Sequence, residues 1–163
     1  MANQTTDADL VRNAAAIAKK LGTTELRRVF LALLNTPNDH GGIGEPGMWW
    51  GPPGVGKSSM IAEFCREMGM TLQILSPVAM GDGAFGVTPV PEGKGTAMRV
   101  QHPAPAWCDR FVTRDDDLNP VPVPGLVFLD EMTLAPPSLQ GPLLSILEGG
   151  MVGDHRLGPR VRV

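Results

Sequence analysis

Gly51-Pro52-Pro53-Gly54-Val55-Gly56-Lys57-Ser58 is the stretch that decides the fold of this chain. It matches the pattern GxxxxGK[ST], in which glycines let the backbone curl so that several N–H groups point at one phosphate. Before it, the apolar run Met48-Trp49-Trp50 predicts a short buried strand. After it, apolar residues at helical spacing predict a helix over residues 58–68, whose dipole favours an anion at its first turn. This order predicts a phosphate-binding loop; a structural glycine-rich turn is the alternative.

The side chains of the loop have distinct expected roles. Lys57 has the length and charge to reach the β- and γ-phosphates of a nucleotide, and the Ser58 hydroxyl is a ligand for Mg²⁺. The expected cofactors are therefore ATP and Mg²⁺. The predicted nucleotide contacts are Gly51, Pro52, Pro53, Gly54, Val55, Gly56, Lys57, Ser58 and Ser59.

A second motif lies about 70 residues further on. Residues 125–130 form a continuous apolar run that ends in a carboxylate, which is typical of a strand in a parallel sheet covered on both faces. Asp130 at its end is predicted to hold Mg²⁺ through water. Glu131 is predicted to polarise the water that attacks the γ-phosphate. A strand end followed by an ordinary helix cap is the alternative.

Together the two motifs resemble a known family. Residues 50–58 and the run Phe128-Leu129-Asp130-Glu131-Met132-Thr133-Leu134-Ala135-Pro136-Pro137-Ser138-Leu139-Gln140 look like the MoxR and dynein-related group of AAA+ ATPases. The resemblance covers residues 48–163. It implies an α/β fold, a P-loop NTPase of AAA+ type with a three-layer αβα sandwich and a parallel sheet. It also implies ATP hydrolysis with Lys57 and Glu131 as catalytic residues.

The same resemblance implies partners and further parts. Members of the group form homo-oligomeric rings of the hexamer type and remodel protein clients, with von Willebrand A-type domain proteins among their partners. Their cores continue into a sensor strand, an arginine finger, a fifth strand and a helical lid, which are expected beyond Val163. The chain is therefore interpreted as the front part of the core, truncated before its last strands, with slow turnover by itself.

The remaining segments predict the organisation around these motifs. Residues 1–36 are expected to form a helical segment, with helices at 7–21 and 23–34, that packs on a partial nucleotide-binding domain at 37–163. Further predictions are a strand at 71–76, a hairpin pairing 86–90 with 96–100 within an insertion at 81–107, a solvated turn at 115–117, a helix from Pro136 or Pro137 to a cap at Gly149, and a hairpin within 151–163.

Composition narrows the function classes. The net charge of -3 and the lack of a Lys/Arg stripe argue against sequence-independent binding of nucleic acid. No apolar run approaches the roughly 20 residues that span a bilayer, and the polar start is not a signal peptide, which indicates the cytoplasm. Cys65 and Cys108 are expected to be buried, idle thiols, and the three histidines suggest no zinc site. Two alternatives to the ATPase stay open: a nucleotide-dependent binding module with little turnover, and a DNA-associated motor.

Overall fold

A small parallel sheet organises the chain, whose computed structural model describes residues 23–37 and 44–163. β1 (Thr71–Leu75) pairs with β6 (Gly125–Leu129) over its full length, from Thr71 opposite Gly125 to Leu75 opposite Leu129. β9 (Val161–Arg162) pairs with the other edge of β6, so the strand order is β1-β6-β9. The predicted mixed α/β class with a parallel sheet is therefore confirmed.

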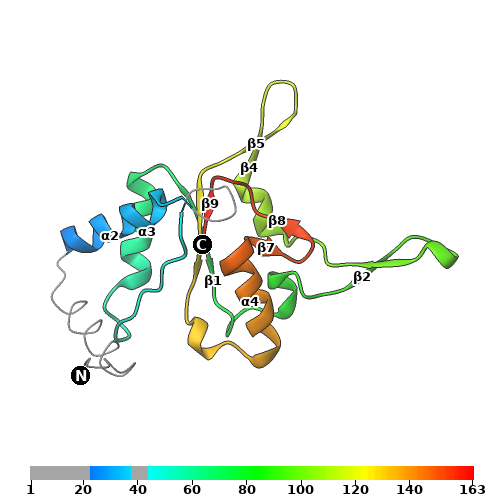
Figure 1. The fold of residues 1–163 in the computed structure, drawn as a ribbon, viewed down its shortest axis with the longest axis horizontal. Helices are drawn as coiled ribbons and strands as arrows, with labels where there is room; N and C mark the ends of the chain where they lie inside the picture. Colours follow the sequence, from blue (N-terminus) through cyan, green and yellow to red (C-terminus); the bar gives the residue numbers. More distant parts are fainter. Residues whose placement is uncertain (1–22, 38–43) are drawn as a thin grey trace, which may run out of the picture.

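Helices cover both faces of this sheet. α2 (Thr23–Asn35) and α3 (Lys57–Glu67) lie on one side, and α4 (Pro137–Gly149) lies on the other (Figure 1). Neighbouring residues of β6 point to opposite faces, as the pleat of a strand requires. Leu126 therefore packs with α2 and α3, whereas Val127 packs with α4.

Each face has its own cluster of buried apolar side chains. The cluster under α2 and α3 consists of Phe30, Leu34, Ile61, Phe64, Cys65 and Leu126. The cluster under α4 is larger and holds Leu75, Phe85, Cys108, Phe111, Val127, Leu139, Leu143, Ile146, Val152 and Leu157. Burial of these side chains is the main favourable term in folding, at roughly 1.5–3 kcal/mol for each fully buried large side chain.

Three hairpins leave the sheet. β2 (Val90–Glu92) pairs with β3 (Arg99–Gln101), β4 (Val112–Arg114) with β5 (Pro120–Pro122), and β7 (Met151–Val152) with β8 (His155–Arg156), all antiparallel. The first two project from the body of the molecule (Figure 1). Short 3-10 helices lie between the strands: η1 (Asp82–Phe85), η2 (Gly95–Ala97), η3 (Ala106–Phe111) and η4 (Met132–Leu134).

The predicted strand at Met48-Trp49-Trp50 is absent. These residues belong to no strand, and both edges of β6 are taken by β1 and β9, so the run has no neighbour with which to exchange backbone hydrogen bonds. Trp49 instead packs edge-on against Phe30 of α2, with ring centroids 5.7 Å apart. Met48 and Trp50 stay largely exposed, at 70% and 72%.

Other predictions shift or extend. The first hairpin pairs 90–92 with 99–101 rather than 86–90 with 96–100, because Gly86, at φ 69°, ends η1 before the strand begins. The predicted 151–163 hairpin is confirmed, but its last residues also supply β9, which the sequence analysis did not foresee. α4 is capped by Gly150 in the left-handed conformation rather than by Gly149. Residues 115–117 form the expected exposed turn, between β4 and β5.

The helix predicted at 7–21 lies outside the described residues. Among the helices that are described, none is both long and apolar enough to cross a bilayer.

The two cysteines are buried and free, as predicted. Burial raises the pKa of the Cys65 thiol to about 11. Burial, with a smaller contribution from the negative charge of Asp109, raises the pKa of the Cys108 thiol to about 12. Neither thiol therefore supplies a thiolate near neutral pH, which removes both from the candidates for chemistry.

The sheet face at Gly125 gives the first testable prediction. A Cβ at Gly125 would collide with the buried ring of Phe111 and approach the Thr71 carbonyl oxygen to 3.1 Å. Gly125→Ala is therefore expected to lower the free energy of unfolding by about 1–3 kcal/mol, the usual cost of overpacking. The matched control is Gly141→Ala on the exposed side of α4, where a Cβ meets nothing within 4 Å. It is expected to add about 0.5–1 kcal/mol through helix propensity. Equal urea midpoints for the two variants would contradict this account.

Candidate functional site

A cavity of about 950 Å³ opens at the carboxyl end of β6. Ligands of open α/β sheets bind outside the carboxyl ends of the strands, so this is the expected place for a site. Its lining comes from the segment before α3, the first turn of α3, the end of β6, η4 and the last turn of α4. The lining residues are Pro46, Gly47, Met48, Trp49, Trp50, Gly51, Pro53, Gly54, Gly56, Lys57, Ser58, Ser59, Val127, Phe128, Leu129, Asp130, Glu131, Met132, Thr133, Leu134, Leu147, Glu148 and Val163.

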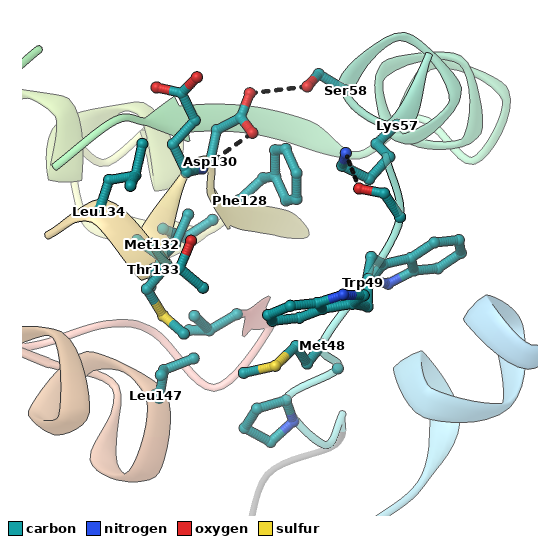
Figure 2. A pocket seen from close by; sticks show the side chains of 18 of the residues that line it. Met48, Trp49, Lys57, Ser58, Phe128, Asp130, Met132, Thr133, Leu134 and Leu147 are labelled. Atoms are coloured by element: carbon teal, nitrogen blue, oxygen red, sulfur yellow. Dashed lines mark hydrogen bonds between the residues drawn. The ribbon is translucent and has the colours of Figure 1, made fainter. Parts of the chain in front are cut away.

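The two sequence motifs meet at this cavity. Ser58 Oγ donates a hydrogen bond to Asp130 Oδ2 at 2.8 Å, across 72 positions of sequence (Figure 2). The Asp130 backbone N–H donates in turn to the Leu75 carbonyl at 2.8 Å, which continues the pairing of β1 with β6 by one residue. The carboxylate is thus held by the sheet itself, while the hydroxyl comes from the first turn of α3.

Lys57 bends back over the loop that precedes it. Its ammonium group donates to the carbonyl oxygens of Gly51 at 3.0 Å and Pro52 at 3.1 Å. Gly54 and Gly56 adopt φ values of 78° and 82°, a left-handed conformation that residues with a Cβ rarely adopt. Both glycines have open space where a Cβ would stand, so backbone conformation rather than crowding requires them.

Glu131 follows Asp130 in a strained conformation. Its φ of 56° is left-handed, which costs a residue with a side chain roughly 1–2 kcal/mol. The turn lets the Glu131 backbone N–H donate to Asp130 Oδ1 at 3.1 Å, so each oxygen of that carboxylate accepts a hydrogen bond. Glu131 itself is exposed and lines the same cavity.

The opposite end of the cavity is apolar. Figure 2 shows Met48 and Leu147 at the end away from Asp130 and Ser58, with Met132 beside them. The sequence analysis did not assign Met132, Leu147 or Glu148 to the site. Leu147 had the spacing of an ordinary core residue on α4, and no motif marks the other two, so only the way α4 returns to the cavity reveals them.

Most predicted site residues come together here. Nine of them line the cavity: Gly51, Pro53, Gly54, Gly56, Lys57, Ser58, Ser59, Asp130 and Glu131. Pro52 and Val55 do not line it, although the Pro52 carbonyl accepts a bond from Lys57. Val55 points outward and is 59% exposed.

The donor atoms of Ser58 and Asp130 fit Mg²⁺ in kind. Both are hard oxygen donors, and Mg²⁺ is usually held by one or two carboxylates together with water and substrate phosphates. The described residues contain no cluster of three or more His, Cys, Asp or Glu side chains of the kind that encloses a tightly held metal. The site therefore suits a cation that arrives with a phosphate ligand.

Comparison of the chain with protein-family models, with curated proteins and with solved structures finds no significant match in any of the three. The functional argument therefore rests on the geometry of the cavity.

Loss of the Ser58 hydroxyl is the prediction that this geometry yields. Ser58→Ala removes an oxygen ligand and the partner of Asp130, so we expect Mg²⁺ to lose most of its effect on nucleotide affinity. Calorimetric titration of ATP with Mg²⁺ and with EDTA measures that effect. Ser145→Ala serves as the control, because the Ser145 hydroxyl bonds only to the Gly141 carbonyl of its own helix. The account fails if the Mg²⁺ effect is the same in Ser58→Ala and the control.

Proposed function

We propose that this chain is an ATP-binding, ATP-hydrolysing module of the MoxR-like AAA+ type. The observation that carries the proposal is the 2.8 Å hydrogen bond between Ser58 and Asp130 at one end of a cavity large enough for a nucleotide. The bond joins a glycine-rich phosphate loop to an acidic strand end, which are the two parts that a P-loop nucleotidase needs side by side.

The polar end of the cavity is the proposed phosphate site. The loop from 51 to 56 and the first turn of α3 supply backbone N–H groups and the positive end of a helix dipole. The Lys57 ammonium, now bonded to two loop carbonyls, would exchange them for the more strongly attracting oxygens of a β- or γ-phosphate. The apolar end, with Met48 and Leu147, would then receive the base.

Asp130 and Glu131 divide the remaining work. A bound Mg²⁺ neutralises charge on the phosphates, and Ser58 and Asp130 are the residues that would hold it. Glu131 belongs to the same cavity but does not bond to Ser58, and the left-handed turn separates it from Asp130. Its carboxylate is therefore free to orient and polarise a water molecule in line with the γ-phosphate.

The finer architecture follows from the same proposal. The parallel sheet with helices on both faces would be the central part of a P-loop NTPase three-layer core. As in the group that it resembles, the chain would work in the cytoplasm in a hexamer-type ring that remodels a protein client, for example a von Willebrand A-type domain protein.

One observation favours a second candidate, a nucleotide-dependent binding module with little turnover. Lys57 is the only basic residue among the described residues that line the cavity. Phosphoryl transfer is usually accelerated by an additional arginine, worth about 10³–10⁵ in rate in the GTPases where it was measured. Without such a group from a neighbouring subunit, the site would bind Mg·ATP but hydrolyse it slowly.

Removal of the Lys57 charge tests nucleotide binding. Lys57→Ala deletes the cation at the polar end, so we expect Mg·ATP affinity to fall at least about 100-fold, corresponding to the loss of charge-assisted hydrogen bonds of about 3 kcal/mol. Titration with a fluorescent ATP analogue measures it, and circular dichroism checks the fold. Lys94→Ala is the matched control, because Lys94 is exposed and lies outside the cavity. Unchanged affinity in folded Lys57→Ala would refute the site.

Glu131→Gln separates binding from turnover. The amide keeps the size of the side chain but loses its basicity, so Mg·ATP affinity should stay within about threefold while the rate of phosphate release falls by about 10²–10⁴. Steady-state phosphate release at several protein concentrations measures the rate and shows whether association raises it. Glu148→Gln is the control at the other end of the cavity. A loss of affinity with unchanged turnover would assign Glu131 to metal or nucleotide binding instead.

A further inference from the structure

The hairpin of β2 and β3 is an arm with both its ends anchored at one place. We call residues 87–101 the arm. Every residue of β2 and β3 is exposed, and the hairpin projects from the body (Figure 1). A two-stranded ribbon of this kind is only marginally stable in water by itself, so its direction depends on its roots. The roots are Gly86, which ends η1, and His102, which follows β3.

Both roots contact the turn at residues 153–154 between β7 and β8. The His102 backbone N–H donates to Asp154 Oδ2 at 2.7 Å, and the Asp154 backbone N–H donates to the His102 carbonyl at 2.9 Å. This reciprocal pair ties the second root to the turn. The charged acceptor makes the first of these hydrogen bonds stronger than one between neutral groups.

The first root is held by close approach. A Cβ at Gly86 would lie 2.5 Å from the Gly153 backbone nitrogen, and a Cβ at Gly153 would collide with the His102 carbonyl oxygen. The three backbones are therefore in van der Waals contact with no side chain between them. A movement of the turn must move both roots, because no intervening side chain can absorb it.

The same turn is connected to the cavity by a short, well-packed path. Leu147 and Glu148 in the last turn of α4 line the cavity, and β7 begins at Met151. Val152 is fully buried beside Ile146 in the larger core cluster. The Leu157 backbone N–H donates to the Gly150 carbonyl at 2.8 Å, which fixes the hairpin of β7 and β8 to the end of α4.

We propose that the turn at 153–154 couples occupancy of the cavity to the position of the arm. This proposal rests on the proposed nucleotide site. A nucleotide whose base contacts Leu147 has different contacts in different positions of the α4 terminus, and this difference is what a ligand needs to shift a conformational equilibrium. The shift passes through β7 to Gly153 and Asp154, and from them to Gly86 and His102. Asp154 is thus a positioning residue for the arm.

A fluorescent label at the tip of the arm tests the coupling. Lys94→Cys places a thiol there, and labelling is selective because Cys65 and Cys108 are buried with raised thiol pKa values. In the labelled protein we expect Mg·ATP to change the anisotropy of the probe, and Lys57→Ala to abolish that change. Binding is measured separately by calorimetry on the same samples.

Variants of the turn then isolate its role. Asp154→Ala should lose most of the anisotropy change, while Mg·ATP affinity changes by less than about fivefold, the lower range of allosteric coupling. Asp154→Asn keeps an acceptor for the His102 N–H and should retain the change. Asp116→Ala is the matched control, an exposed aspartate in the turn between β4 and β5. A merely structural role for Asp154 predicts equal effects on affinity and anisotropy.

The possible results separate the two proposals. If the wild-type arm protein binds no Mg·ATP, the proposed function fails and the coupling fails with it. If it binds Mg·ATP but the anisotropy is constant, or if Asp154→Ala responds like Asp116→Ala, the coupling alone is overturned. Should Asp154→Ala not fold, hydrogen exchange of the His102 and Asp154 amides in the unsubstituted chain decides. Both must change their protection when Mg·ATP binds.

Discussion

The parallel pairing of β1 with β6 is the constraint on which the candidate site depends. The last hydrogen bond of that ladder, from the Asp130 N–H to the Leu75 carbonyl, places a carboxylate directly beyond the sheet. α3 packs on one face of the same sheet through Ile61 and Phe64, so its first turn arrives beside that carboxylate. The Ser58–Asp130 contact is therefore a consequence of how strand and helix pack, and it could not form if either were displaced by a turn of helix or a residue of register.

The packing of apolar side chains decides how firmly this geometry is held. The two clusters on opposite faces of the sheet fix α2 and α3 on one side and α4 on the other. α4 leaves the site after Glu131 and η4 and returns to the cavity with its last turn, so the cavity has a polar end on the sheet and an apolar end on α4. A ligand that fills both ends contacts two elements whose relative position depends on packing alone. This is why the site and the β7–β8 hairpin are parts of one mechanical unit.

Much of the site was predictable because its chemistry is encoded in local sequence. The glycine spacing before Lys57 specifies a loop that only residues tolerant of positive φ can form, and Gly54 and Gly56 adopt that conformation. The apolar run before Asp130 has the composition of a two-sided buried strand, and β6 is such a strand. Helices α2, α3 and α4 follow from apolar periodicity with turn residues at their ends, since these signals act within a few residues.

What required the tertiary structure was every feature that depends on a distant partner. Met48-Trp49-Trp50 has the composition of a strand, yet a strand exists only where a neighbour accepts and donates its hydrogen bonds, and both edges of β6 are occupied. β9 is only two residues long, too short for periodicity to indicate it, and it pairs because the hairpin before it delivers the chain to β6. Leu147 was a core residue by its spacing and became a cavity wall through the path of α4. The sequence by itself determined the phosphate loop, the acidic strand end and the helices, because each is a local choice of backbone conformation. The tertiary structure alone decided which of these segments meet, because contacts between residues far apart in the chain depend on the packing of the whole.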